Sequence, residues 1–357
     1  MGNGTIKGMT GPVRVRRRLG LLLVVLVTLL TAGWLDGGAG PSAHGGPTRP
    51  GGAQSDGPRA DRQPGPPSAT LVRSERSAPR TVDLTIDSPA LGREVGTRVL
   101  LPPGFDTRPE RRWPVLYLLH GCCYPGESYR LWTEKTDVET VTASLEALVV
   151  MPEGGPVGYY SDWWHGGRGG ADAWETFHLT ELRQVLERTL RAGDRRAVAG
   201  VSMGGTGAML YAARNPGVFT MAASFSGRLD TQADADAVLR KVARFTPDPT
   251  ALWGDPQAQS AVWAAHNPQR LLEALPAGFP VYVSCGDGRP GPMDGPKAGF
   301  SRLEAQFDGM AEAFVDRARE RGLHVTAHRY GAGTHTWRYW ARELATALPQ
   351  LASALGV

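Results

Sequence analysis

The sequence predicts an α/β protein built on one doubly wound, mostly parallel sheet. Along the 357 residues, short β-branched or apolar runs alternate with segments whose apolar residues recur at helical spacing, the pattern of repeated strand–helix units. Two runs, 147–151 and 113–121 up to its terminal turn at His120-Gly121, are continuously apolar, as strands covered on both faces are. A glycine-flanked serine, Gly200-Val-Ser202-Met-Gly204, also links a strand-like run to a small-residue helix. This is the spacing of a sharp strand-to-helix turn.

Residues 1–36 predict a signal peptide. Arg14 and Arg16–Arg18 precede the apolar run Leu19–Leu30, and small residues follow it. A basic stretch, an apolar core of about a dozen residues and a small-residue exit are typical of secretory signals. The run is shorter than the roughly 20 residues of a membrane-spanning helix. We therefore expect a secreted protein, located outside the cell or in the cell envelope. The adjacent arginines also permit the twin-arginine route.

Composition separates a second segment from the folded body. Residues 37–68 are rich in Gly, Pro, Ser and Arg and have almost no large apolar side chain, so we expect a disordered linker. Residues 1–80 hold 11 Lys/Arg and 4 Asp/Glu, which leaves 28 against 31 for the rest of the chain. The net charge of +4 therefore comes from the N-terminal part, and nucleic acid is not an expected partner. Three cysteines do not make a disulfide framework.

One domain is expected over residues 69–357, with organised sequence from about Thr70. The predicted strands are 81–86, 96–101, 113–121, 147–151, 196–201, 219–225, 279–285 and 325–330. The predicted helices are 136–145, 174–190, 208–214, 300–321 and 336–355. Residues 228–275 lack clean strand periodicity and are interpreted as a helical insertion or cap.

The serine turn is the first candidate for chemistry. Glycine is expected at positions 200 and 204 because a side chain two residues from Ser202 would clash in so sharp a turn. Ser202 then lies at the carboxyl edge of the sheet and at a helix N-terminus, which favours developing negative charge. Because the chain contains 46 glycines, the spacing alone is weak evidence. The hypothesis needs a histidine and an acid in the right order.

A histidine follows the last predicted strand. In this architecture the chain order is nucleophile, acid, histidine, and of eight histidines only His335 occupies that loop. Four carboxylates follow the strand that ends at Cys285: Asp287, Asp294, Glu304 and Asp308. Proximity to the strand end favours Asp287, and the other three stay open at this point.

Nine blocks of the sequence, the serine turn among them, carry a resemblance to a known family. They are Tyr117–Gly121, Met151–Gly155, Tyr160–Trp163, Trp174–Phe177, Gly200–Met203, Leu252–Pro256, Asn267–Pro268, Val283–Gly286 and Gly333–Trp337 with Tyr339–Trp340. From about Pro114 onwards the chain resembles the esterase superfamily of α/β-hydrolases. Within it, the chain most resembles the secreted mycolyltransferases, which are fibronectin-binding trehalose acyltransferases.

The resemblance implies an α/β-hydrolase fold and a Ser-His-Glu triad. The family acid is a glutamate in a helix-borne Leu-Glu pair, which Leu303-Glu304 matches, so Glu304 is preferred to Asp287. Ser202 would attack an ester carbonyl and His335 would act as the base. The backbone N–H groups of Cys122 and Met203 would form the oxyanion hole. No cofactor or metal is expected.

Substrate contacts are expected from four side chains: His120, Asp162, Trp163 and Trp337. The mycolyltransferases have an acidic residue and an arginine near the oxyanion turn that help bind trehalose. This sequence has His120 and Cys123 there, which weakens trehalose as the expected acceptor. A bridge between the adjacent Cys122 and Cys123 would be strained, so free thiols are expected.

The predicted function is a secreted serine esterase or acyltransferase acting on esters of carbohydrate or cell-envelope lipid. One alternative is a feruloyl- or acetyl-ester hydrolase acting on plant polymer. The other is a non-catalytic secreted adhesion or matrix-binding protein. The expected partner is an acylated sugar or lipid, with peripheral association with the cell envelope and a monomeric state.

Overall fold

A computed structural model describes residues 68–357. The predicted signal, 1–36, and all but the last residue of the predicted linker, 37–68, lie outside the described residues. Within residues 68–357, none of the helices combines the length and the apolar character needed to cross a membrane.

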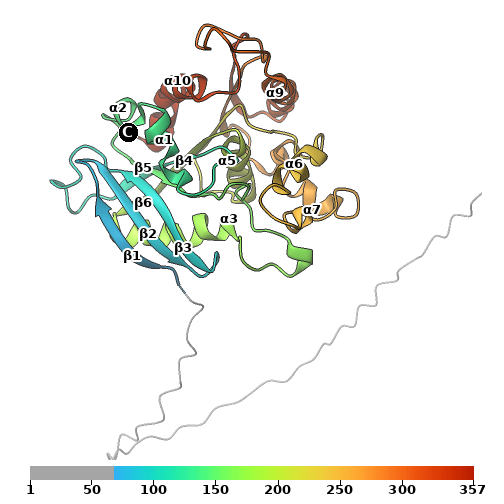
Figure 1. Cartoon of the computed structure of the whole chain (residues 1–357). Coiled ribbons are helices and arrows are strands. Elements are labelled where there is room, and N and C mark those ends of the chain that lie inside the picture. Colours follow the sequence, from blue (N-terminus) through green and yellow to red (C-terminus); the bar gives the residue numbers. More distant parts are fainter. Residues whose placement is uncertain (1–67) are drawn as a thin grey trace, which may run out of the picture. The chain divides into compact units, whose positions relative to one another are not determined.

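A single nine-stranded sheet organises the described chain (Figure 1). Its strands are β1 (Thr70–Arg76), β2 (Thr81–Ser88), β3 (Arg93–Leu100), β4 (Trp113–Leu119), β5 (Leu148–Pro152), β6 (Ala192–Val201), β7 (Met221–Phe225), β8 (Pro280–Cys285) and β9 (His324–Arg329). Their order is β1-β2-β3-β5-β4-β6-β7-β8-β9. The neighbouring pairs β1-β2, β2-β3 and β3-β5 are antiparallel, and the remaining pairs, from β5-β4 to β8-β9, are parallel. The predicted doubly wound, mostly parallel sheet is confirmed.

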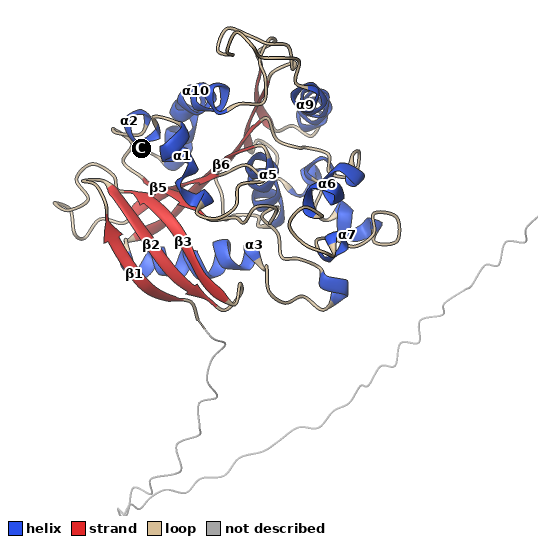
Figure 2. Ribbon diagram, in the orientation of Figure 1, coloured by secondary structure: helices blue, strands red, loops and turns tan. Residues whose placement is uncertain are grey.

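Helices cover both faces of the sheet (Figure 2). They are α1 (Leu131–Lys135), α2 (Val138–Val141), α3 (Trp174–Thr176), α4 (Arg183–Thr189), α5 (Met203–Arg214), α6 (Ala235–Val242), α7 (Ser260–Ala264), α8 (Pro268–Leu271), α9 (Arg302–Glu320) and α10 (Trp337–Leu355). Alternate residues of β4 enter separate cores, because successive strand side chains point to opposite faces. Tyr117 belongs to a buried cluster that includes residues of α4, α5 and α9, and Leu116 belongs to a second cluster that includes residues of α1, α2 and α10.

Three predicted elements differ from the structure. The predicted helix 136–145 is helical only at residues 138–141, which form α2. Strand β1 was not predicted because its mostly polar side chains are exposed. The predicted helix 174–190 contains a wide turn at 177–182 between α3 and α4, a π-type bulge that sequence periodicity does not signal.

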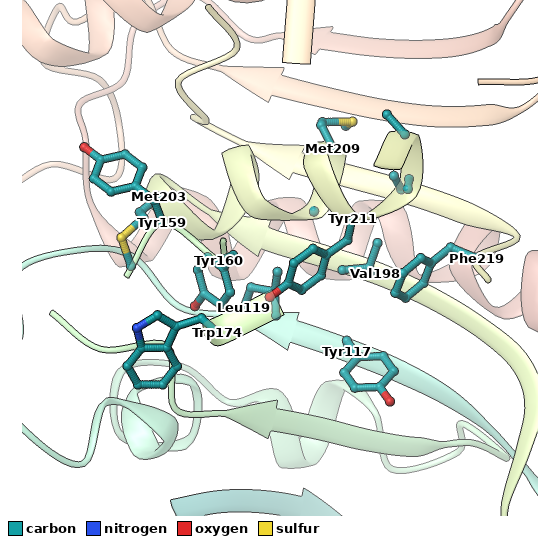
Figure 3. Packing of buried hydrophobic residues seen from close by; sticks show 14 of the residues in the cluster. Tyr117, Leu119, Tyr159, Tyr160, Trp174, Val198, Met203, Met209, Tyr211 and Phe219 are labelled. Atoms are coloured by element: carbon teal, nitrogen blue, oxygen red, sulfur yellow. The ribbon is translucent and has the colours of Figure 1, made fainter. Parts of the chain in front are cut away.

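Small residues allow α5 to pack closely against aromatic side chains (Figure 3). A Cβ on Gly207 would lie 2.6 Å from the ring of Tyr160, which is closer than packed atoms approach. Tyr160 is fully buried, and its ring meets that of Tyr211 edge-on at 6.0 Å between centroids. This packing holds the first turns of α5, and therefore the serine turn before it, close to the sheet.

Candidate active site

Ser202 occupies a strained turn between β6 and α5. Its φ and ψ are 54° and −118°, a conformation that non-glycine residues rarely adopt and that is concentrated at functional sites. A Cβ on Gly200 would lie 2.2 Å from the Gly204 carbonyl oxygen, and one on Gly204 would lie 2.4 Å from the Leu119 carbonyl oxygen. Both positions therefore require glycine, as expected for a serine presented at the carboxyl edge of the sheet.

Three predicted residues come together at this edge. His335 Nε2 lies 2.9 Å from Ser202 Oγ, and His335 Nδ1 lies 2.6 Å from Glu304 Oε2. Because a carboxylate only accepts, Nδ1 carries the proton and Nε2 is left to accept from the serine hydroxyl. Each side chain comes from a different element: Ser202 precedes α5, Glu304 lies in the first turn of α9, and His335 lies between β9 and α10.

Glu304 is buried and held as a carboxylate. Burial would raise its pKa, but hydrogen bonds and charge from its neighbours, His335 first among them, hold the pKa below its usual value. Glu304 Oε1 accepts from the Gly286 N–H at 2.8 Å and from Ser226 Oγ at 2.7 Å. These bonds to the charged form outweigh desolvation. The side chain can therefore orient His335 and stabilise an imidazolium.

Ser226 belongs to this network and was not predicted. It follows β7 with a positive φ of 50°, donates to Glu304 and accepts from Trp340 Nε1 at 3.0 Å. The ring of Trp340 also meets the ring of His335 edge-on at 4.8 Å. The available sequence signal was the position of Ser226, at the end of a strand on the same sheet edge as Ser202.

The other candidate acids have other partners. Asp287 accepts from the backbone and side chain of Arg289, and Asp308 pairs with Arg329. Asp294 accepts from Gly291, Thr334 and Tyr339 and so holds the loop after β8 to the start of α10. Of the four carboxylates, Glu304 is the one hydrogen-bonded to His335.

The two predicted oxyanion donors lie next to Ser202. Met203 opens α5, and a Cβ on Gly121, the residue before Cys122, would lie 3.3 Å from Ser202 Cβ. Within residues 68–357, neither the Cys122 N–H nor the Met203 N–H donates to a protein acceptor. Both groups are therefore available to a substrate oxygen.

Two cavities lie at Ser202 and at the sequence neighbours of His335. A recess of about 10 Å³ beside Ser202 is lined also by Cys122, Tyr159, Met203, Thr206, Arg228, Lys241 and Phe307. This space suffices for about one water-sized group. A much larger groove, of about 770 Å³, runs past Thr334, Thr336 and Trp337 on either side of His335 in the sequence. Ser202 thus borders a recess the size of one water molecule, and the residues that flank His335 in the sequence border a wide groove.

The cysteines are free thiols. A hydrogen bond with Cys123 and the nearby charge of Lys241 lower the pKa of Cys122 to about 6 against the effect of burial, and the same hydrogen bond raises the pKa of Cys123. Lys241 Nζ lies 3.8 Å from Cys122 Sγ. In the part of the chain that the structure describes, no three His, Cys, Asp or Glu side chains are grouped to hold a metal ion.

Three of the four predicted substrate contacts are occupied by the protein itself. His120 is buried, with Nδ1 2.7 Å from the Gly121 carbonyl oxygen and Nε2 accepting from the Gly154 N–H at 2.9 Å. Asp162 accepts from the backbone and hydroxyl of Thr176, and Trp163 is buried in the core. These side chains support the framework of the site. Trp337 lines the wide groove beside His335.

A strained serine, a histidine and a buried carboxylate meet at the carboxyl edge of this sheet, and the whole has the arrangement of the α/β-hydrolase fold. The family model described as "Putative esterase" matches residues 88–351. The chain therefore belongs to the Esterase family, and membership supports a carboxylic ester hydrolase or acyltransferase activity.

Several relatives show where in this family the chain lies. It is 31% identical over 256 residues to the diacylglycerol acyltransferase/mycolyltransferase Ag85B of Mycobacterium intracellulare, over 68% of this chain and 76% of that protein. It is 37% identical over 211 residues to the esterase Rv1288 of Mycobacterium tuberculosis, over 57% of this chain and 45% of that protein. The crystal structure of Mycobacterium tuberculosis MPT51 (FbpC1) superposes with a TM-score of 0.63 at 26% identity, over 75% of this chain and 96% of that chain. The predicted resemblance to the mycolyltransferases is confirmed.

Proposed function

We propose that the protein is a secreted serine esterase or acyltransferase that forms an acyl-enzyme on esters of carbohydrate or cell-envelope lipid. The observation that carries the proposal is the continuous chain of contacts from Ser202 through His335 to Glu304, with distances of 2.9 and 2.6 Å. The domain organisation is part of the proposal: residues 1–36 direct export, 37–68 link, and 69–357 form the catalytic domain, with 228–275 inserted.

The mechanism follows from the roles that these atoms can take. Ser202 Oγ attacks the ester carbonyl while His335 Nε2 takes the hydroxyl proton. The backbone N–H groups of Cys122 and Met203 then donate to the oxyanion; one such donor is worth about 2.7–4 kcal/mol of transition-state stabilisation. His335 returns the proton to the leaving alcohol, and the acyl group stays on Ser202. Water or a second alcohol then takes the acyl group by the same steps in reverse.

The two cavities favour particular substrates. His335 protonates the leaving alcohol, and the groove of about 770 Å³ lined by its chain neighbours Thr334, Thr336 and Trp337 supports a bulky alcohol such as a sugar. The recess beside Ser202, of about 10 Å³, is lined by the predicted oxyanion donors Cys122 and Met203 and supports binding of the carbonyl oxygen. A carbohydrate ester fits this arrangement. The acyltransferase activity named for Ag85B suggests that a sugar hydroxyl could replace water as the acceptor.

An assay of product masses tests the proposal. The purified protein is incubated with ethyl esters and sugar esters of short and long acids, with and without trehalose or glucose. We expect free acid from short-chain esters, and a new acylated sugar if transfer occurs. Ser202→Ala should abolish both products in a folded protein; more than about one thousandth of the wild-type rate would contradict the role of Ser202. No turnover of any ester by the wild type would favour a non-catalytic binding protein.

A further inference from the structure

The loop after β7 places an arginine at the recess beside the nucleophile. Thr206 Oγ1, in the first turns of α5, donates to the Arg228 carbonyl oxygen at 3.0 Å. A Cβ on Gly227 would lie 3.0 Å from the Gly205 carbonyl carbon, so the loop packs tightly onto the helix that follows Ser202. Arg228 and Ser202 both line the recess of about 10 Å³.

Two contacts fix the guanidinium of Arg228. Its side chain is 3% exposed, and Nη1 donates to Asp234 Oδ2 at 2.7 Å. The same oxygen of Asp234 accepts from Gln306 Nε2 at 2.7 Å. The guanidinium carbon lies 4.9 Å from the ring centre of Phe307, another residue that lines the recess. The protein therefore holds the guanidinium in place before a substrate binds, as preorganised charge stabilisation requires.

One end of this guanidinium has no partner in the protein. Nη2 is buried, and within residues 68–357 it has no hydrogen-bond acceptor. A buried donor without a partner costs about 1–3 kcal/mol, and a guanidinium can only donate. Among the described residues that line the recess, none is Asp or Glu, and Lys241 adds a second cation. The recess is therefore suited to an oxygen that carries negative charge.

The carbonyl oxygen of the ester is the expected occupant of the recess. The predicted oxyanion donors Cys122 and Met203 line it together with Ser202. Its volume of about 10 Å³ admits about one water-sized group, so an oxygen atom there contacts the residues that enclose it. A neutral carbonyl oxygen has two lone pairs, which the two backbone N–H groups can take. Attack by Ser202 gives this oxygen a third lone pair and a negative charge, which Arg228 can meet.

We infer that Arg228 is a catalytic residue that donates from Nη2 to the oxyanion, as a charged third donor of the oxyanion hole. This inference rests on the proposed function. Ser202 Oγ bonds to the carbonyl carbon, its proton goes to His335 Nε2, and the π electron pair moves onto the oxygen. When that pair returns, the bond to the alcohol breaks and His335 protonates the alcohol. Because Arg228 meets the full charge only in the transition state, it acts on kcat more than on KM.

Hydrolysis of 4-nitrophenyl acetate gives the first test. Arg228→Met keeps the apolar stem of the side chain but removes its donors and its charge. We expect kcat to fall by about 10²- to 10³-fold, the effect of losing one oxyanion donor, while KM stays within about threefold. Arg240→Met is the control: it removes an exposed arginine of α6 that is not among the residues lining the recess, and it should match the wild type.

A trifluoromethyl ketone provides a readout that a purely structural role would not move. The ketone adds to Ser202 as a hemiketal whose oxygen takes the place of the oxyanion, and its fluorine NMR signal reports whether that oxygen is ionised. A nearby cation lowers the pKa of an acid. Arg228→Met should therefore raise the midpoint of this titration by about one to two pH units.

The outcomes separate the inference from the proposed function. An equal titration midpoint in Arg228→Met and the wild type, or an equal kcat, overturns the inference while the esterase function stands. If Arg228→Met does not fold, Arg228→Lys keeps a charge beside Asp234 but loses the planar fork of donors. It should still lower kcat by about tenfold, and a wild-type kcat would overturn the inference. Inactivity of the wild type on every ester would overturn both.

Discussion

Two histidines, His335 and His178, have the same hydrogen-bond pattern in very different surroundings. His178 Nε2 lies 2.7 Å from the Glu153 carbonyl oxygen, and its Nδ1 lies 2.6 Å from the Tyr211 hydroxyl. Each histidine therefore donates to an oxygen with one nitrogen and accepts from a hydroxyl with the other. By this pattern alone both resemble a catalytic base next to a nucleophile.

Charge and access distinguish the two sites. His335 donates to a carboxylate and its side chain is 15% exposed, whereas His178 donates to a neutral carbonyl and is fully buried. Burial lowers the pKa of His178 to about 3 and raises the pKa of Tyr211 well above its usual value. A buried histidine without a counter-charge cannot hold a proton near neutral pH. The comparison teaches that the partner's charge, more than the hydrogen-bond geometry, makes a histidine suitable for catalysis.

The largest expected effect on kcat comes from replacing each histidine in turn. Glutamine can donate and accept as the neutral ring does but cannot take up a proton. We expect His335→Gln to lower kcat by roughly 10⁴- to 10⁶-fold, as for the loss of other catalytic bases. His178→Gln should keep kcat/KM within about threefold. Ester kinetics measure both variants, and circular dichroism confirms that they are folded. If His178→Gln lost as much activity as His335→Gln, His335 would not be distinguished as the catalytic base.

The next effect comes from removing the counter-charge. Glu304→Gln keeps the shape of the side chain but no longer favours the imidazolium, so we expect kcat to fall by roughly 10³- to 10⁴-fold. Glu153→Gln is the matched change on the other side, where the carboxylate accepts from the N–H groups of Gly155 and Tyr129. It should lower the denaturation midpoint and leave kcat nearly unchanged. Equal kcat in Glu304→Gln and the wild type would exclude Glu304 as the acid.

A smaller effect is expected on stability as a function of pH. Because the pKa of His178 is about 3 in the folded protein and near 6.5 in an unfolded chain, the unfolded state binds more protons between these values. Stability is therefore complete above pH 6.5 and falls as the pH is lowered, by about 1.4 kcal/mol per pH unit for this one group. Urea unfolding at pH 8 and pH 5 should show a loss roughly 2 kcal/mol larger in the wild type than in His178→Gln. The same loss in both proteins would show that His178 does not stay neutral.

The sequence predicted the residues whose position depends on strand order. Ser202 and His335 follow strand ends, and all strands of the parallel part end at one edge, so chain order alone brings them together. Strand order alone did not select Glu304 among the four carboxylates, because it lies on a helix 19 residues after Cys285. The family resemblance was needed to prefer it. Asp287 is closer to the strand end, but its side chain turns to Arg289.

Polar residues of a matched motif can support the site through the protein's own hydrogen bonds. His120 and Asp162 lie in matched blocks and are polar, yet the backbone around the site occupies their hydrogen-bonding atoms. Sequence shows the residue type but not which partner takes its lone pairs. Ser226 was missed for the opposite reason, since it lies just before a segment with no periodicity and no motif. Its role depends on a loop conformation that only the packed structure shows.

The smallest predicted effect concerns Ser226, which supports the carboxylate without touching the substrate. Ser226→Ala removes one hydrogen bond from Glu304 and leaves that of the Gly286 N–H. Because the lost bond favoured the charged form, the pKa of Glu304 should rise, and the acid limb of the kcat profile should move to higher pH. At neutral pH we expect about a tenfold loss of kcat, close to one hydrogen bond to a charged group. Ester hydrolysis measured from pH 4 to pH 9 gives both quantities.

A serine on β7, the strand that ends just before Ser226, provides the control. Ser224 is buried in β7, two residues before Ser226, and within residues 68–357 its hydroxyl has no hydrogen-bond partner. Ser224→Ala should therefore leave the acid limb in place, although it changes the packing of the same strand. If both variants lose activity without any shift of the acid limb, Ser226 acts through packing. A shift confined to Ser226→Ala instead shows that the hydrogen bond from Ser226 helps to keep Glu304 charged. His178, whose partners are a carbonyl oxygen and a hydroxyl, has no such support for a charge.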